Sequence, residues 1–297
     1  MAATPILFDR ALLRARRRRA RALGAATFLL DRVADDLVER LEAVTRRFAL
    51  AVDLATPGAA LRQRLSRHPS IGCIVAFGDR DSGSERADIV GDEEALPFAD
   101  ASLDLVVSAL ALHLVNDLPG TLIQIRRALK PDGLFLAALL GGDTLTELRQ
   151  SFAAAEAEVE GGVSPRVAPF ADLRDMGALL QRAGFALPVV DVDRITVRYA
   201  SAFALMHDLR RMGATNALAE RRRTPLRRAT LARAAEIYAE RFADSDGRLR
   251  ATFDIVWLSG WAPDASQQKP LRPGSAQRRL ADALGTRELP AGEKAGS

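Results

Sequence analysis

His113 is the residue of this sequence whose type and position are best suited to chemistry. It follows the apolar run LDLVVSAL at 103–110 by three residues, and such a run is typical of a buried strand. A neutral imidazole beside a sheet edge can accept a proton or orient a substrate. His113 is therefore a candidate catalytic residue, and a purely structural histidine is the other interpretation.

Asp143 is the second candidate for a catalytic role. Together with Thr144 it follows the apolar run GLFLAAL at 133–139. Its carboxylate could face a substrate at the carboxyl edge of a sheet, where open α/β sheets bind ligands. It could equally cap the helix that should follow.

Metal chemistry is not predicted. The three histidines His68, His113 and His207 lie on separate segments, so their spacing composes no facial triad of two histidines and a carboxylate. Cys73 is the single cysteine, which excludes a cysteine-based metal cluster and an internal disulfide and fits a reducing compartment.

The run AVDLATPGAALRQRL at 51–65 has the layout of a nucleotide-binding loop but few of its glycines. An apolar strand should contain Asp53, and a helix should begin near Gly58. Loops that approach a cofactor closely use glycine, because it has no Cβ and adopts positive φ easily. Gly58 is the one glycine of this run, so the loop should be unusual.

The chain around these residues has an α/β pattern. Apolar runs of strand length alternate with helical periodicity, which predicts a parallel sheet covered by helices. The predicted strands are 48–54, 72–78, 87–90, 103–110, 133–139, 186–193 and 251–261, and the predicted helices are 58–68, 117–129, 144–160 and 171–183.

Three segments complete the predicted organisation. Residues 1–47 should form basic and amphipathic helices, because apolar residues recur at helical spacing in 25–47. Residues 201–242 should be helices inserted before the last strand of a domain spanning 48–261. Residues 262–297 have little periodicity, as expected of a partly flexible extension.

Arginine dominates the basic residues and is clustered at 10–22 and 209–234. Such clusters either bind phosphates and acidic lipid surfaces or remain solvated. Aromatic residues do not alternate with them, so no nucleic-acid partner is expected. No apolar run reaches the length of a membrane span. We expect a cytoplasmic protein, with peripheral contact to the inner membrane as one option and a mitochondrial transit peptide as an alternative interpretation of the Arg-rich start.

Several longer stretches resemble a known family. DEEALPFADASLDLVVSALALHLVNDLPGTLIQIRRALKPDGLFL at 92–136 is similar to the middle motifs of class I S-adenosylmethionine-dependent methyltransferases. The start ILFDRALLRARRRRA, GGDTLTELR at 141–149, EGGVSPRVAPFADLRDMGALLQRAGF at 160–185 and the pair GW at 260–261 resemble the family of methyltransferase-like complex I assembly factor 5 and its bacterial relatives.

This resemblance implies a Rossmann-like fold with a seven-stranded, mostly parallel sheet whose last strand, 251–261, is antiparallel. It implies S-adenosylmethionine as cofactor and a protein substrate, a core subunit of respiratory complex I, which is either methylated or hydroxylated on arginine. A recognition factor without catalysis, and a methyltransferase of a small acyl or carrier-bound substrate, are the alternatives.

The resemblance also implies a cofactor site. Asp79, with Asp81 as its rival, should bind the ribose hydroxyls, and Asp92 with Glu93 should lie near the adenine. The other implied cofactor contacts are Asp53, Ala55, Gly58, Ser108 and Leu110, with Leu96 and Phe98 closing on the ring and Asn116 following nearby.

The loop departs from the family pattern, which places glycines at Ala55, Pro57 and Ala59. Pro57 has a fixed φ and no N–H, and an alanine forced to positive φ loses roughly 1 kcal/mol. We therefore expect a displaced loop and weak cofactor binding.

The insertion at 201–242 should cover the pocket beside Ser108 and His113 as a lid. We predict that its arginines dock a complex I subunit near the membrane, and that they are Arg210, Arg211, Arg221, Arg222 and Arg223.

Overall fold

The computed structural model describes residues 6–79, 87–170, 173–268, 275 and 279–287. The chain divides into two compact units, residues 1–263 and 264–297. Within the second unit, the described part contains one short helix, α9 (Leu280–Leu284).

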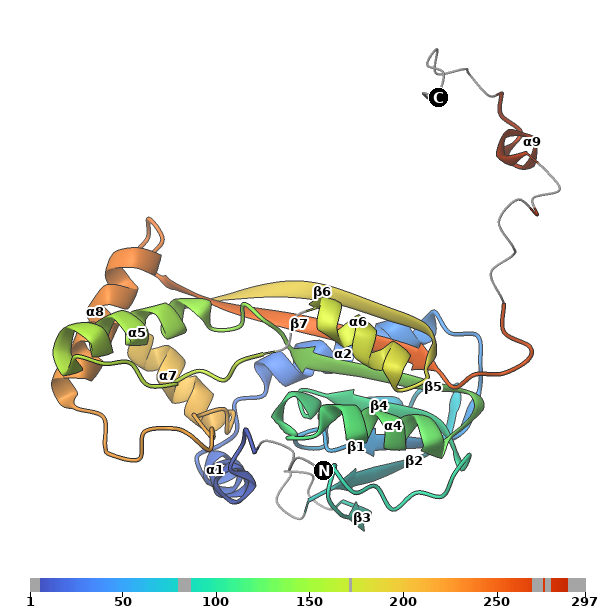
Figure 1. Ribbon diagram of the computed structural model, residues 1–297, viewed down its shortest axis with the longest axis horizontal. Coiled ribbons are helices and arrows are strands. Elements are labelled where there is room, and N and C mark those ends of the chain that lie inside the picture. The colour runs from blue at the N-terminus through green and yellow to red at the C-terminus, as the bar shows by residue number, and fades with distance from the viewer. Residues whose placement is uncertain (1–5, 80–86, 171–172, 269–274, 276–278, 288–297) are drawn as a thin grey trace. The chain divides into compact units, whose positions relative to one another are not determined.

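The first unit is built on a single sheet (Figure 1). Its described strands lie in the order β3-β2-β1-β4-β5-β7-β6. β7 runs antiparallel to both β5 and β6, and the other neighbours are parallel. The predicted sheet with an antiparallel last strand is therefore confirmed. The strands are β1 (Phe48–Leu54), β2 (Ile71–Gly78), β3 (Ile89–Val90), β4 (Leu103–Ala109), β5 (Leu129–Leu140), β6 (Ala186–Tyr199) and β7 (Leu249–Trp261).

Helices cover both faces of the sheet (Figure 1). Neighbouring residues of one strand point to opposite faces: Ala51 packs in the core on the side of α2, and Val52 packs in the core on the side of α4 and α6. This two-sided burial explains why the central strands are continuous apolar runs. The helices are α2 (Phe28–Glu42), α3 (Ala60–Leu65), α4 (Leu118–Ala128) and α6 (Leu173–Arg182), with a 3₁₀ turn, η1 (Leu112–Leu114), after β4.

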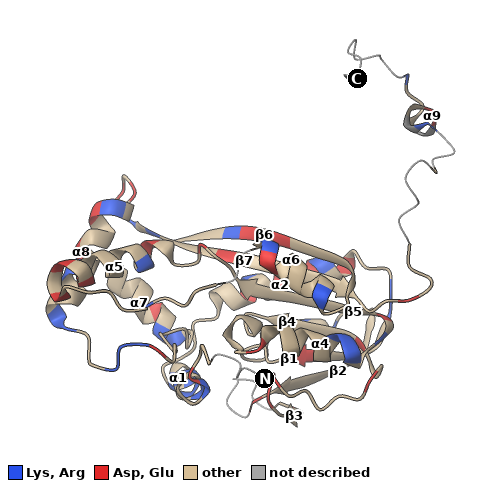
Figure 2. Ribbon diagram, viewed as in Figure 1, with Lys and Arg blue, Asp and Glu red and all other residues tan. Residues whose placement is uncertain are grey.

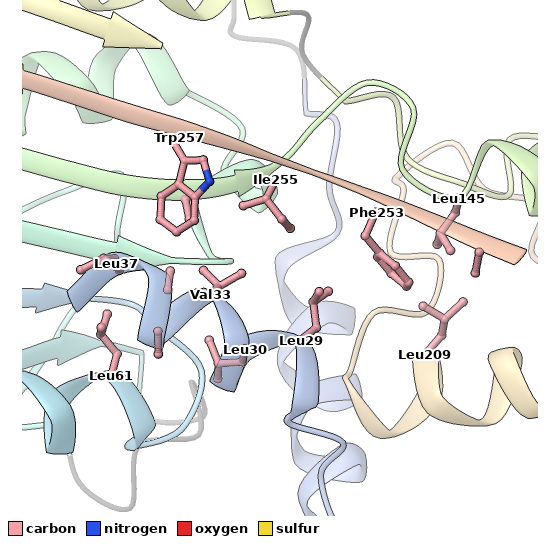
Figure 3. Close-up of a cluster of buried hydrophobic side chains, with 14 of the residues drawn as sticks. Leu29, Leu30, Val33, Leu37, Leu61, Leu145, Leu209, Phe253, Ile255 and Trp257 are labelled. Carbon is pink, nitrogen blue, oxygen red and sulfur yellow. The ribbon is translucent and has the colours of Figure 1, made fainter. Parts of the chain in front are cut away.

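α2 is the amphipathic helix expected near the N-terminus. Its apolar face carries Val33 and Leu37, which lie on the side facing Ile255 and Trp257 of β7 (Figure 3), and Leu30 belongs to the same buried cluster. Val33 and Leu37 are fully buried, and burial of each such side chain contributes about 1.5–3 kcal/mol. The N-terminal segment is thus part of the main core.

β6 continues six residues beyond its predicted end at 193. It is an edge strand whose outward residues alternate with half-buried ones, and Arg194 and Arg198 form ion pairs with Asp254 and Asp244. Charged residues suit an edge strand because they face water. The apolar pattern therefore fades before the strand ends.

The insertion between β6 and β7 forms the lid. It contains α7 (Ala202–Arg211) and α8 (Arg228–Phe242), and α8 packs along α5 (Thr146–Glu160) (Figure 1). The lid helices share one core with α2, through residues such as Leu205 and Ile237.

The basic N-terminal helix α1 (Arg10–Ala22) packs against α7. Asp9 caps it, because its carboxylate accepts a hydrogen bond from Leu12 N at 3.0 Å. Figure 2 shows the concentration of basic residues on this helix. In the described part of the chain, no helix has the length and apolar character needed to cross a membrane.

Candidate functional site

The loop after β1 keeps a left-handed residue where the family pattern has its first glycine. Ala55 has φ 58°, and its N–H donates to the Phe77 carbonyl of β2 at 2.6 Å. Gly58 also has positive φ, 74°. We expected the loop to avoid the left-handed backbone conformation, which is unfavourable for alanine by about 1 kcal/mol. That expectation is wrong at Ala55, which has this conformation.

Buried polar groups fasten this loop to β4. The Thr56 hydroxyl accepts a hydrogen bond from Ala109 N at 2.9 Å and bonds to the Asp53 carboxyl. Asp53 is 3% exposed, and burial raises its pKa to about 7 despite the bond to Thr56. The Ser108 hydroxyl donates to the Leu54 carbonyl at 2.8 Å. The hydrogen bonds of Asp53 and Ser108 thus hold the loop against the sheet. Contact between their side chains and the cofactor stays a prediction.

The acids of the predicted cofactor site lie along the carboxyl edge of the sheet, and arginines of α1 hold them. Asp79 follows β2 directly, is 8% exposed and pairs with Arg14 Nε at 3.1 Å. Arg10 forms ion pairs with Asp92, at 3.0 Å, and with the buried Glu93. Asp81, the rival of Asp79, lies outside the described residues.

The apolar residues predicted to close on the cofactor ring belong to the apolar core on this side of the sheet. Leu96 is buried, and the Phe98 ring packs edge to face on Phe77, with centroids 5.4 Å apart. Leu110 directly follows β4 and has φ 51°, and its N–H donates to the Ala138 carbonyl at 2.8 Å. Two acids, an apolar wall and a left-handed loop fit the hydroxyls, the ring and the close backbone approach of a nucleoside cofactor.

His113 lies in η1, with its ring 6.0 Å from that of Phe170 between centroids. Its Nδ1 is buried and has no hydrogen-bond partner among the described residues. Burial, and then the positive charge of Arg17, lower its pKa to about 3. A neutral imidazole with so low a pKa is a poor proton acceptor but can still form a hydrogen bond.

Asp143 does not cap α5, whereas its role toward a substrate stays a prediction. Its side chain is 61% exposed and pairs with Arg194 at 2.5 Å, away from the residues that line the cavity described below. The cap of α5 is Leu145, at φ 54° and without a side-chain bond. Thr144 is fully buried and its hydroxyl bonds to the Asp254 backbone. Asp143 is thus a surface ion-pair residue.

A cavity of about 720 Å³ lies beside the cofactor loop. Pro57, Gly58, Leu110 and His113 form its edge toward the sheet. α1, α2, α5, the 166–170 loop and the lid contribute mostly apolar walls. The lid is therefore placed as predicted over His113, whereas Ser108 is buried in the sheet.

The charged groups that line this cavity are all basic. The lining contains no aspartate or glutamate among the described residues, and its arginines are Arg16, Arg17, Arg19, Arg21, Arg166, Arg210 and Arg211. Arg166 is held in place by the fully buried Glu156, which also accepts hydrogen bonds from Ser164 N and Oγ, both at 2.7 Å.

The sequence interpretation identified the arginine cluster at 10–22 but did not predict that its side chains pair with the acids of the sheet edge and line the cavity. Leu13, Arg17 and Ala20 share the buried face of α1, because spacings of four and three residues fall on one side of a helix. The sequence signal for a buried arginine was its position between two apolar residues on the same helix face. This signal was hard to recognise because the other residues of the helix are also rich in arginine.

Comparisons with known proteins agree with this geometry. Residues 41–137 match the family model described as a methyltransferase domain. The chain is similar to the arginine-hydroxylase NDUFAF5 of Danio rerio, with 38% identity over 93% of this chain and 89% of the relative. It is also similar to the malonyl-[acyl-carrier protein] O-methyltransferase of Gallionella capsiferriformans, with 34% identity over 87% of this chain and 92% of the relative.

A solved structure supports the fold. A Bacillus halodurans protein of the methyltransferase class matches 77% of this chain and 100% of its own, with a TM-score of 0.53 and 16% identity. The sheet order, the loop after β1 and the relatives that span nearly the whole chain lead to one assignment. The chain belongs to the class I methyltransferase superfamily, whose cofactor is S-adenosylmethionine, as a relative of the NDUFAF5 arginine hydroxylases.

Proposed function

We propose that the protein transfers a methyl group from S-adenosylmethionine to an anionic acceptor, a carboxylate on an apolar chain, held in the cavity under the lid. One observation carries this proposal. The cavity adjoins the cofactor loop at Pro57 and Gly58, its walls are mostly apolar, and its charged lining is entirely basic among the described residues.

The residues that would hold the cofactor are those of the sheet edge. We assign Asp79 to the ribose hydroxyls, Asp92 and Glu93 to the adenine, and Ala55 to the close approach of the backbone, an assignment supported by the burial of Asp79 and Glu93 and the left-handed φ of Ala55. When bound, S-adenosylmethionine supplies an electrophilic methyl group on a sulfonium. The chain's task is to align the acceptor and exclude water, which accounts for much of the rate in such a reaction.

The charge of the cavity selects the acceptor. A carboxylate is attracted by the basic lining and is nucleophilic without losing a proton, so His113 with its pKa of about 3 need not act as a base. A guanidinium acceptor would enter a cavity lined by seven arginines and would be repelled. The activity named for the malonyl-carrier relatives therefore fits this cavity better.

Arginine hydroxylation during complex I assembly is the second candidate. It is supported by the NDUFAF5 relatives, whose similarity extends over 93% of the chain and so includes the lid. This function would require the partner subunit to bring acidic groups that neutralise the cavity lining.

Two measurements test the proposal. Calorimetric titration with S-adenosylmethionine should show binding, and mass spectrometry should then detect methylation of a malonyl thioester. A peptide with one exposed arginine is the comparison acceptor. Mass spectrometry detects whether a methyl group or an oxygen atom has been added to it. Modification of the peptide but not the thioester would overturn the carboxylate assignment in favour of the second candidate. Absence of S-adenosylmethionine binding would overturn methyl transfer.

A further inference from the structure

Arg17 is buried near the middle of α1 and has no counter-ion of its own among the described residues. Its residue is 9% exposed, and within the described part of the chain its guanidinium forms no hydrogen bond and no ion pair. An ionised side chain placed in this way costs several kcal/mol unless it finds a partner. Its environment therefore favours an anion that the chain does not supply.

The nearest acids are engaged elsewhere. Glu93 and Asp79 attract Arg17 electrostatically, but their carboxylates lie within ion-pair distance of Arg10 and Arg14 respectively. Desolvation outweighs this attraction, and the pKa of Arg17 is lowered from its ordinary value. The local acids thus leave the guanidinium undercompensated.

Arg17 and His113 both line the cavity and lie close enough for the arginine to lower the pKa of the histidine. The buried Nδ1 of His113 also lacks a partner among the described residues. α1 packs against α7 and lies close to Gly213, where an added Cβ would be 3.4 Å from Arg17 Cα and Cγ. The two groups are therefore held at one wall of a cavity rather than on a mobile surface.

We propose that Arg17 and His113 form a subsite for a single carboxylate, at the place where the cofactor edge meets the acceptor cavity. The guanidinium forms the charged pair, and the neutral imidazole, in its Nδ1–H tautomer, donates to the carboxylate. This inference rests on the proposed function, which supplies two sources of that group: the amino-acid carboxylate of S-adenosylmethionine and the free carboxylate of the acceptor.

The test compares probes that differ only by the carboxylate. Calorimetry measures binding of S-adenosylmethionine against its decarboxylated form, and of malonyl-N-acetylcysteamine against acetyl-N-acetylcysteamine in the presence of S-adenosylhomocysteine. Wild-type protein should prefer the carboxylate-bearing member of at least one pair. In R17Q that preference should fall by roughly 10- to 100-fold, as expected for a hydrogen bond between charged groups, and H113F should lose part of it.

The pair that loses its preference identifies the source of the carboxylate. R18Q is the matched control, because Arg18 is an exposed neighbour on the same helix that does not line the cavity; it should retain both preferences. R17Q without ligand should unfold no more easily than wild type, because it removes a buried charge that lacks a counter-ion, whereas a structural role predicts destabilisation.

Equal preferences in wild type and R17Q would overturn the subsite while leaving the proposed function intact, provided that S-adenosylmethionine still binds. Failure of all four probes to bind wild type would overturn both.

Discussion

At the residue scale, Ala55 bears a conformational cost that a single substitution can remove. Its φ of 58° is easy for glycine and unfavourable for alanine. Ala55→Gly should raise the free energy of unfolding by about 1 kcal/mol, measured by urea denaturation, and should tighten S-adenosylmethionine binding in calorimetry if strain also limits the loop.

Ala101 provides the control for this substitution. It too has positive φ, 51°, but it is exposed and outside the site. Ala101→Gly should stabilise the protein by a similar amount and leave cofactor affinity unchanged. Stabilisation by Ala101→Gly without any by Ala55→Gly would show that the loop conformation is not strained.

The buried Asp53 and His113 predict opposite dependences of stability on pH. The pKa of Asp53 is raised from 3.8 to about 7, so the folded state retains a proton that the unfolded state loses, and stability falls as pH rises between these values. The pKa of His113 is lowered from 6.5 to about 3, so stability falls as pH decreases through that interval.

Asp53→Asn should therefore remove the loss of stability toward neutral pH, and His113→Gln the loss toward acid pH. Denaturant midpoints measured from pH 4 to pH 7 separate the two effects. A wild-type slope in Asp53→Asn would mean that this carboxyl is ionised in the folded protein at low pH.

At the element scale, we expect α1 to compete with the cofactor for acidic groups. The Arg14 guanidinium forms an ion pair with Asp79, the residue predicted to bind the ribose. Arg14→Gln should tighten S-adenosylmethionine binding by up to roughly tenfold while lowering stability, because a largely buried carboxylate loses its partner. Both quantities can be measured by calorimetry and thermal unfolding.

Arg32→Gln is the matched control, since Arg32 forms an exposed pair with Asp36 within α2 and should change neither quantity appreciably. Weaker cofactor binding in Arg14→Gln would contradict competition and would instead make Arg14 a contact of the cofactor.

The elements also show what the sequence could predict. β1 was predicted at its observed bounds, 48–54, because a buried apolar run in a parallel sheet leaves a clear signal. The residues of the cofactor edge followed from the family resemblance. The conformation of Ala55 and the burial of Arg17 did not, because both depend on tertiary contacts, with β2 in one case and with the lid in the other. The secondary-structure propensities of neighbouring residues predict neither contact.

At the scale of the whole molecule, the lid arginines proposed to dock a partner divide into two groups. Arg211, Arg221 and Arg222 form ion pairs with Asp208, Asp9 and Glu160, so their removal would disturb the fold. That leaves Arg210 and Arg223 for a test of docking.

The double substitution Arg210→Gln and Arg223→Gln should reduce co-purification of the protein with a complex I core subunit severalfold, because charge pairing at a rim supports association. Arg47→Gln with Arg67→Gln, two exposed positions outside the lid, is the control. Equal recovery of the subunit with both double variants would remove the docking role.

The lid leaves and rejoins the sheet at one place. Tyr199, the last residue of β6, pairs with Leu249, the first residue of β7, so the two ends of the intervening segment are neighbours. A segment whose ends are already fixed side by side can change in length or composition at small entropic cost. Residues 200–248 therefore form an insertion whose adjacent ends allow it to be replaced as a unit. Related chains could acquire different acceptors by replacing this segment, while the strands that carry the cofactor edge keep their register.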